Sequence, residues 1–579
     1  MEKVDLLIAD TEVYNTYLKQ FIKADVYIKG SKIYYVDMEH KHELEAERVM
    51  DGNGYRMLPG FIDIHMHIES SMMTPVSFGK RAAECGVTTL VSEPHEIANV
   101  MGAEGIREMI NGAKDSPIDI YYGIPSSVPS TNETLETTGG VIGLAQMKQL
   151  MQEDGVVCVG EVMNYRQIIK GDELEITKFL DYLEEEDPQA VIEGHCPSLV
   201  GLDLAKFLYR GINGDHTEHT LQEIKERFLN GMFVELQEKM LQPEILDYIK
   251  EHDLYEHCCF VTDDTMADKL KEQGQLNYVV RRAVEMGFPL NEAIYCATYT
   301  PARRMKLNDR ESLAPGRKAD FQLVKTENCS KFEPEYVFKD GRQIYHLGDA
   351  GETAEPYRFP EDFYRSIHLD EISAEQLEPR VSVRDGEVKV RVIEVHDGRT
   401  QTQERMVSMQ VKDGRLQWKD SGCMLAAVLE RHGKNGNIGC GFVSGGCLKR
   451  GAAATTYFHD HHNLMVMGAD IDDMLTAARR IVKLNGGICT AEDGVVKAEL
   501  PLPVCGILSE LPADEIGKKL SQVRKSLEAL GYRHYNPIMS LCTLGLPVSP
   551  ALKLTDCGLV DVAKGEIVPL AAEDDNKQI

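Results

Sequence analysis

Short apolar runs alternate with amphipathic stretches through the middle of the chain, from Pro59 to about residue 300. Apolar runs of about four to eight residues between polar turns are typical of buried strands, and the longer stretches have the spacing of helices. This alternation predicts a parallel sheet built from βα units. Eight strands are expected, at residues 61–65, 88–93, 118–124, 156–161, 190–195, 211–216, 232–236 and 259–263.

Helices are expected between these strands and after the last one. Eight strands within one segment of this length are typical of a (β/α)8 barrel, so we expect residues 59–304 to form one. The helices are expected at residues 76–85, 102–113, 144–151, 176–185, 202–209, 221–229, 243–251 and 276–286.

The segments on either side of the barrel have different patterns. Residues 1–58 and 305–345 contain short strands and turns, which we expect to join in one composite small β domain. Residues 346–385 are polar and rich in Glu and Pro, as in a linker. Residues 386–579 are expected to form a separate C-terminal α+β domain, with helices at 471–484 and 513–530. The overall fold class is therefore α/β.

Metal-binding residue types follow the apolar runs of the barrel segment. His65 and His67 end the first strand, Glu161 the fourth, His195 the fifth, His216 the sixth and Asp263 the eighth. Chemistry in such barrels lies at the carboxyl ends of the strands, where these side chains would meet. Imidazole and carboxylate groups bind ions such as Zn, Mn and Fe.

These six residues can hold two divalent ions. His65, His67 and Asp263 would bind one ion, His195 and His216 would bind the other, and Glu161 would bridge them. A water shared by two cations has a lowered pKa, so hydroxide is available near neutral pH. Asp263 can accept a proton during attack and pass it to a leaving group. The sequence thus predicts metal-assisted hydrolysis at an electron-poor carbon.

The composition and net charge restrict the classes of binding partner that we expect for this protein. The 579 residues carry a formal net charge of −30, which argues against binding to the nucleic-acid backbone and favours a small-molecule substrate. No apolar run is long enough to span a membrane, and the start of the chain lacks a secretory pattern. The 14 cysteines are scattered, as in reduced core thiols. We therefore expect a cytoplasmic protein without a membrane partner.

Several longer motifs resemble the adenine deaminase family of the amidohydrolase superfamily, over nearly the whole chain. They are Pro-Gly-Phe-Ile-Asp-Ile-His-Met-His-Ile-Glu-Ser-Ser-Met-Met-Thr-Pro (59–75), Glu-Pro-His-Glu-Ile-Ala-Asn-Val-Met-Gly (93–102), Gly-Glu-Val-Met-Asn-Tyr (160–165), Gly-His-Cys-Pro (194–197) and Thr-Asp-Asp (262–264). Ala-Pro-Gly-x-x-Ala-Asp (314–320) belongs to the superfamily more broadly. His-Asp-His-His-Asn (459–463) and Leu-Pro-Leu-Pro (500–503) resemble the C-terminal signatures of the family.

The resemblance implies a binuclear site and the hydrolytic deamination of adenine to hypoxanthine and ammonia in purine salvage, by attack of metal-bridged hydroxide at C6. It implies Mn or Fe as the metal, with Zn as an alternative, and a homo-oligomer, with a dimer favoured. Glu161 stands where related enzymes carry a modified Lys. Asp264 resembles the residue that contacts the purine ring nitrogen, by analogy only.

Four positions depart from the family pattern: Thr217, Gln237, Thr265 and Gln275. We expect them in loops at the active-site face, so metal chemistry would be retained while the substrate contacts differ. This leaves open an alternative, a binuclear amidohydrolase that acts on another aminopurine or on a cyclic amide or amidine. A third possibility, a metal-binding or regulatory protein that kept the fold without turnover, is disfavoured by the intact Glu161 and Asp263.

Four further residues are candidates for substrate binding. His95 and Glu96 follow the second strand and could contact substrate or orient a metal ligand. Glu69 and Ser70 open the first βα loop, where Ser70 could equally cap the next helix.

Two features of the C-terminal segment invite a site assignment. For the cluster of residues 459–462 we favour a hydrogen-bonded turn or lid edge over a metal site. Gly439, Gly441, Gly445 and Gly446 are expected to form a loose loop. That loop lacks the Gly-Lys-Ser/Thr ending of a phosphate loop, which excludes nucleotide-phosphate binding there.

Overall fold

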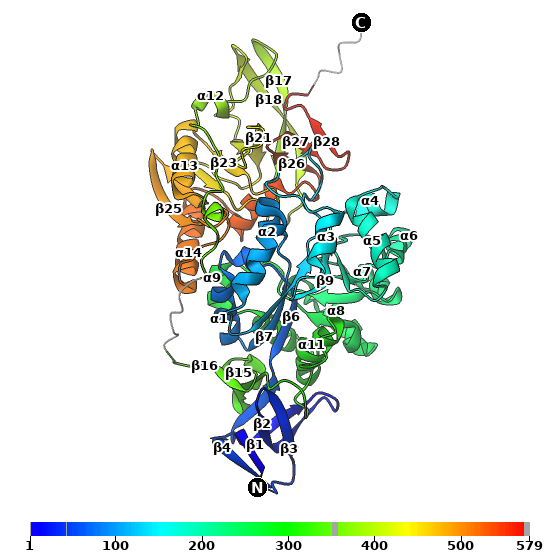
Figure 1. The fold of residues 1–579 in the computed structure, drawn as a ribbon. Coiled ribbons are helices and arrows are strands. Elements are labelled where there is room, and N and C mark those ends of the chain that lie inside the picture. The colour runs from blue at the N-terminus through cyan, green and yellow to red at the C-terminus, as the bar shows by residue number, and fades with distance from the viewer. Residues whose placement is uncertain (1, 42, 350–356, 573–579) are drawn as a thin grey trace. The chain divides into compact units, whose positions relative to one another are not determined.

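The computed structural model describes residues 2–41, 43–349 and 357–572, in two compact units (Figure 1). Unit 1 contains the described residues up to Pro94, then Met109–Ser126 and Leu144–Tyr357. Unit 2 contains His95–Glu108, Ser127–Gly143 and the described residues from Arg358 onward. The predicted domain boundaries stay predictions, and residues 350–356 of the predicted linker lie outside the described residues.

Unit 1 is built around an eight-stranded parallel sheet whose strands lie in sequence order. The first and last strands meet where Met66 bridges Asp263, and the Asp263 N–H donates to the His65 carbonyl at 3.1 Å. The strands are β6 (Phe61–Met66), β7 (Val87–Ser92), β8 (Asp119–Ile124), β9 (Val156–Val162), β10 (Ile192–Gly194), β11 (Gly214–Asp215), β12 (Phe233–Leu236) and β13 (Cys258–Phe260). The predicted (β/α)8 barrel is confirmed, although β10, β11 and β13 are shorter than expected.

Helices separate the barrel strands. In α10 the buried residues Leu276, Val279, Val280 and Ala283 follow the helical spacing. The helices of this region are α1 (Pro75–Glu84), α2 (His95–Ala113), α3 (Leu144–Leu150), α4 (Tyr165–Lys170), α5 (Glu175–Glu186), α6 (Gly201–Tyr209), α7 (Leu221–Leu229), α8 (Pro243–Glu251), α9 (Ala267–Gln273), α10 (Leu276–Glu285) and α11 (Leu290–Arg304), with short 3-10 turns η1 (Ile68–Ser71), η2 (Glu238–Met240) and η3 (Leu254–His257). The sequence pattern does not predict α4, α9 or α11. In the described residues no helix is both long and apolar enough to cross a membrane.

Helix α2 begins seven residues earlier than expected and contains a bend. Gly102 has φ 62° and ψ −148° inside the helix, so the first turns and the last turns have different axes. The first part, from His95 to Glu108, belongs to unit 2, and the part from Met109 belongs to unit 1.

A second sheet of unit 1 combines strands from before and after the barrel. Its order is β16-β15-β14-β5-β1-β2-β3, with β4 paired to β1. Phe321 of β14 lies opposite Pro59 of β5, so the two segments share one ladder, as expected of a composite β domain. The elements are β1 (Glu2–Asn15), β2 (Gln20–Lys29), β3 (Lys32–Asp37), β4 (Leu44–Asp51), β5 (Tyr55–Pro59), β14 (Phe321–Lys325), η4 (Thr326–Lys331), β15 (Pro334–Lys339) and β16 (Arg342–His346).

Unit 2 is built on a nine-stranded sheet in the order β19-β18-β17-β21-β20-β23-β22-β24-β25. Helices and a three-stranded sheet complete it, which confirms a separate C-terminal α+β fold. The elements are η5 (Glu361–Tyr364), α12 (Ala374–Leu377), β17 (Gly386–Glu394), β18 (Gln403–Lys412), β19 (Arg415–Leu416), β20 (Met424–Leu429), β21 (Ile438–Ser444), β22 (Ala452–Thr455), β23 (Leu464–Gly468), α13 (Ile471–Leu484), β24 (Gly487–Glu492), β25 (Val495–Pro501), α14 (Ala513–Ala529), α15 (Pro537–Cys542), η6 (Thr543–Gly545), β26 (Leu552–Thr555), β27 (Gly558–Asp561) and β28 (Glu566–Val568).

The inserted segment 127–143 is bound into unit 2 by hydrogen bonds. The amide of Asn463 donates to the Thr137 carbonyl at 2.8 Å, and the Thr137 N–H donates to Asp556 Oδ1 at 3.0 Å. The Thr555 hydroxyl donates to the Leu135 carbonyl at 2.5 Å. Unit 2 is therefore assembled from three separate stretches of the chain.

The expectation of a loose glycine loop at residues 439–446 is wrong for its first half. Gly439 and Gly441 lie on β21, which pairs with β17 and β20 in the sheet. A Cβ at Gly439 would lie 2.0 Å from the Thr555 carbonyl oxygen, whereas a Cβ at Gly441 would first meet the side chain of Leu559 at 3.0 Å. Glycine is required at 439 because the backbone at Thr555 comes too close for a side chain.

This close approach predicts different costs for two substitutions on the same strand. Gly439→Ala forces backbone apart and should lower the free energy of unfolding by about 1–3 kcal/mol. In Gly441→Ala the added methyl group would first contact the side chain of Leu559, which can rotate away. This substitution should therefore lower the free energy of unfolding by clearly less. Chemical denaturation of the two variants and the parent chain, followed by circular dichroism, checks the ranking. Equal costs would contradict the assigned packing of β21.

Candidate metal centre

The six predicted ligands converge at the carboxyl ends of the barrel strands. Each comes from the end of a strand or the residues just after it, so the topology brings together positions far apart in the chain. Three overlapping groups have ligand atoms within 4.8 Å of one another and could hold a metal ion: His65 with His67 and Glu161, His65 with His216 and Asp263, and Glu161 with His195 and His216.

The two carboxylate oxygens of Glu161 face different histidines. Oε1 lies 3.6 Å from Nε2 of His67. Oε2 lies 2.7 Å from Nδ1 of His195 and 3.3 Å from Nε2 of His216. A carboxylate that presents one oxygen to each of two donor sets has the arrangement needed to bridge two ions.

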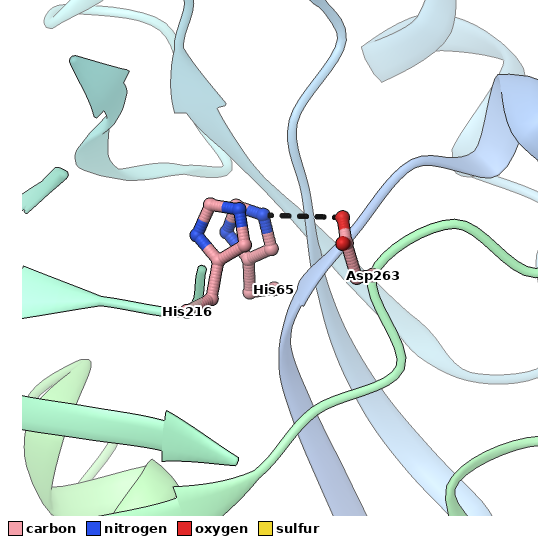
Figure 2. Close-up of side chains that lie close together, drawn as sticks. All are labelled: His65, His216 and Asp263. Carbon is pink, nitrogen blue, oxygen red and sulfur yellow. Dashed lines mark ion pairs between the residues drawn. The ribbon is translucent and has the colours of Figure 1, made fainter. Parts of the chain in front are cut away.

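His65, His216 and Asp263 form the second side of the cluster (Figure 2). The rings of His65 and His216 are stacked, with centroids 3.6 Å apart, and Nε2 of His65 lies 3.8 Å from Oδ1 of Asp263. Nε2 of His65 and Nδ1 of His216 are buried and have no hydrogen-bond partner in the described part of the chain. Buried imidazole nitrogens without such partners beside carboxylates fit a site for divalent ions.

The imidazole of His67 is oriented from behind. Its Nδ1 lies 3.0 Å from the Glu93 carbonyl oxygen, which can only accept, so Nδ1 carries the proton and Nε2 faces Glu161 and Asp263. A backbone carbonyl that fixes the ring and tautomer in this way is typical of a metal-binding histidine.

The carboxylate of Asp263 is held by its backbone and by a neighbour. Asp263 has φ 57°, a conformation that Asp tolerates better than most residues, and this turns its side chain towards His67. Nε2 of Gln237 donates to Oδ2 of Asp263 at 3.3 Å and to the His216 carbonyl at 2.8 Å. Gln237 therefore ties the residues after β12 to those after β11 and β13.

The electrostatics keep the carboxylates charged and His65 neutral. Burial opposes ionisation of Glu161, but the charges of His195 and His216 hold its pKa well below its ordinary value. Burial, followed by the charge of His216, holds the pKa of His65 well below its usual range. Burial also opposes ionisation of Asp263, but hydrogen bonding to His67 and nearby histidine charges lower its pKa. Ionised carboxylate and neutral imidazole are the forms that bind metals. Although burial opposes it, hydrogen bonding to Asp263 raises the pKa of His67, and the charge of Glu161 raises that of His195.

The predicted substrate-side residues fall into two groups. In unit 1, Glu69 and Ser70 are fully buried on η1, and the Ser70 hydroxyl donates to Oδ1 of Asp264 at 2.5 Å. Ser70 does not cap α1, because Thr74 occupies that position. In unit 2, His95 and Glu96 begin α2. A role for these residues in binding substrate stays a prediction.

Three of the four residues that differ from the family pattern form hydrogen bonds with other residues of the barrel. The Thr217 hydroxyl donates to Oδ1 of Asp215 at 2.9 Å, and Nε2 of Gln275 donates to Oδ2 of Asp63 at 2.5 Å. Gln237 holds Asp263, as described above. Thr265 is half-buried in the turn after Asp264. Thr217, Gln237 and Gln275 thus form hydrogen bonds to residues at the strands or just after their ends.

Sequence reasoning missed a buried network beneath the site. Asp215, which precedes the predicted ligand His216, accepts from Nε of Arg227 at 2.8 Å and lies 2.7 Å from Nε2 of His219. Arg227 and Asp215 are both fully buried. The alternation of side chains along a strand offered a signal, since Asp215 must point opposite to His216. Such a network fixes the backbone that carries His216.

Two family models match the chain. The amidohydrolase family model matches residues 56–344, which include the barrel and its metal-capable cluster. The adenine deaminase C-terminal domain model matches residues 399–566. A solved structure described as that of an adenine deaminase aligns with a TM-score of 0.44 and 16% identity, and covers 59% of this chain and 99% of that one.

Curated relatives extend over almost the whole chain. An adenine deaminase of Clostridium perfringens is 46% identical over 576 residues, which are 98% of this chain and 100% of that protein. Adenine deaminase 2 of Shouchella clausii is 46% identical over 571 residues, which are 98% of this chain and 99% of that protein. The chain belongs to the amidohydrolase family and, within it, to the adenine deaminases.

Proposed function

We propose that this protein hydrolyses adenine to hypoxanthine and ammonia. The observation that carries the proposal is the 46% identity to proteins named adenine deaminase, which extends over 98% of the chain. The site geometry supports the same chemistry, because ligands for two metal ions surround the strand ends. A role in purine salvage, a cytoplasmic location and a homodimeric assembly are part of the proposal.

We propose that His65, His67 and Asp263 hold one divalent ion, that His195 and His216 hold a second, and that Glu161 bridges the two. The nitrogen and oxygen donors suit Mn and Fe, with Zn as an alternative. When bound, two such ions would lower the pKa of a water molecule and so make a nucleophile available near neutral pH.

The carboxylate of Asp263 then transfers the proton. Asp263 accepts a proton from the attacking water as the new C6–O bond forms, and passes it to the amino group as the C6–N bond breaks. The products are hypoxanthine and ammonia, so water supplies every added atom. Asp264 would contact a ring nitrogen of the purine, with its carboxylate restrained by the hydroxyl of Ser70 at 2.5 Å. Glu69, His95 and Glu96 complete the proposed set of substrate-binding residues.

The proposal predicts metal-dependent ammonia release from adenine. Chelation followed by dialysis should abolish the activity, because the donor atoms alone cannot activate water. Reloading with Mn or Fe should restore it, with about two ions bound in the barrel. A coupled ammonia assay with adenine, other aminopurines and cyclic amides, alongside metal analysis, checks both points. Full metal content with turnover only of another substrate would refute adenine as the substrate.

Glu161 should be indispensable for both metal content and turnover. Glu161→Gln removes a charge that is shared by both proposed ions, so kcat/KM should fall by on the order of 100-fold or more, with less metal bound. Glu218→Gln is a matched control, because Glu218 is exposed in the loop after β11. The control should retain activity within about twofold. Unchanged activity and metal content in the Glu161 variant would invalidate the bridging assignment.

Gln237 should act as a positioning residue for Asp263. Gln237→Leu removes the hydrogen bond to the carboxylate, so kcat should fall by about tenfold. The lost donor also raises the pKa of Asp263, and since Asp263 must be ionised to accept a proton, the acidic limb of the pH profile should move to higher pH. Gln242→Leu, whose side chain donates to the Lys239 carbonyl at 3.4 Å, is the control. A fall in kcat without any change in the pH profile would argue for a purely structural role.

A further inference from the structure

Two buried aspartates of the barrel lie next to the proposed metal ligands without being among them. Asp63 lies two residues before His65 on β6, and Asp215 lies directly before His216 at the end of β11. Both side chains are fully buried. Because a buried carboxylate is costly unless donors surround it, the partners of each aspartate indicate what it does.

Asp63 joins β6 to the residues after β13, the two segments that carry the ligands proposed for the first ion. Its Oδ1 accepts from the backbone N–H groups of His65 and Thr262, both at 3.4 Å. Its Oδ2 accepts from the Thr262 hydroxyl at 2.6 Å and from Nε2 of Gln275 at 2.5 Å. Since Thr262 directly precedes Asp263, one carboxylate holds the backbone on both sides of the barrel closure.

Asp215 joins the residues after β10 to those after β11, the two segments that carry the ligands proposed for the second ion. Its Oδ1 accepts from the N–H and the hydroxyl of Thr217 at 3.1 and 2.9 Å. Its Oδ2 accepts from the thiol of Cys196 at 3.0 Å. Cys196 directly follows His195, and Thr217 directly follows His216, so this carboxylate holds the backbone beside both histidines.

Arg227 adds a second connection between the same two segments. Its Nε donates to Oδ2 of Asp215 at 2.8 Å, and its Nη2 donates to the Cys196 carbonyl at 2.8 Å. Both Arg227 and Asp215 are fully buried. A planar guanidinium that bonds a carboxylate and a carbonyl at once restricts the position of one relative to the other.

The two aspartates act on different parts of the barrel. The partners named for Asp63 lie on β6, after β13 and just before α10, whereas those named for Asp215 lie after β10, after β11 and on α7. A metal ligand binds only when its donor atom is held in place, and groups behind the ligands change metal affinity by about 10- to 100-fold. Each aspartate is therefore placed to affect the ligands of one ion.

We propose that Asp63 and Asp215 are positioning residues, each of which sets the affinity of the barrel for one of the two ions. Asp63 acts on the ion held from β6 and the segment after β13. Asp215, with its partner Arg227, acts on the ion held from the segments after β10 and β11. This inference rests on the binuclear site of the proposed function, and it adds that the two affinities can be changed separately although Glu161 bridges the ions.

The same substitution at both positions tests the proposal. In Asp63→Asn and Asp215→Asn the new amide nitrogen cannot accept, and because donors face both oxygens of each aspartate, hydrogen bonds are lost in either orientation. Metal-free protein is titrated with Mn, and free Mn is measured by electron paramagnetic resonance. In each variant one dissociation constant should rise about 10- to 100-fold, while the other stays within about twofold of the parent.

Anomalous diffraction at the Mn absorption edge then identifies the ion that remains. In crystals with only the stronger site filled, the peak is expected beside His195 in Asp63→Asn and beside His67 in Asp215→Asn. Loss of the same ion in both variants, or equal weakening of both ions in either variant, would overturn the proposal. A parent that binds a single Mn would refute the binuclear site as well, whereas two sites with unaltered affinities in the variants would refute the positioning role alone.

A second pair of variants separates positioning from a structural role. Arg227→Lys keeps the positive charge beside Asp215 but lacks the planar group that also reaches the Cys196 carbonyl, so it should weaken the second ion only. Arg310→Lys is the matched control, because Arg310 is also buried and donates to Asp119 at 2.5 Å, at the start of β8. Circular dichroism confirms that both variants are folded. Equal Mn affinities in the two lysine variants would contradict the proposed role of Asp215 and Arg227.

Discussion

The hydrogen bond between the Asp263 N–H and the His65 carbonyl joins the last barrel strand to the first, and the site depends on that junction. Asp263 adopts a left-handed conformation three residues after the end of β13, and its Oδ1 lies 3.8 Å from Nε2 of His65 and 3.5 Å from Nε2 of His67. An open sheet would leave Asp263 at one edge and His65 at the other. Closure therefore brings the first and last ligands together, and Nε2 of Gln237 donates to the carboxylate of Asp263.

Much of this arrangement could be predicted from the sequence, for a simple physical reason. Strand periodicity and strand ends are local properties, so His65, Glu161 and His216 could each be placed without knowledge of their neighbours. Parallel topology then brings their ends to one face. The mutual geometry could not be predicted in the same way. That Glu161 offers one oxygen to His67 and the other to His195 depends on the barrel's closure and stagger, which no single segment encodes.

The roles of some residues depend on contacts far along the chain, which the local sequence does not reveal. Gly439 and Gly441 have the composition of a loop, yet they form a strand because a distant hairpin packs against them and leaves no room at 439 for a side chain. Thr217 and Gln275 were expected in loops at the active-site face, and their hydrogen bonds go to Asp215 and Asp63 within the barrel. Their effect on substrate contacts stays a prediction. In each case tertiary contacts far along the chain decide the role of the residue. A departure from a family pattern therefore shows where a residue differs, but not what that residue touches.

The division of α2 between the two units, after Glu108, has a practical consequence for producing fragments of the molecule. Because the first part of this helix and residues 127–143 belong to unit 2, that unit is not a C-terminal segment that can be excised. A fragment starting at Arg358 would lack Leu135 and Thr137, whose backbone groups form hydrogen bonds with Asn463, Asp556 and Thr555. The polar side chains of these three residues would lose those partners. Conversely, a fragment ending before Arg358 would carry stretches whose partners are missing. If unit 2 were transferred to another protein, the two inserted stretches would have to be transferred together with the segment from Arg358 onward.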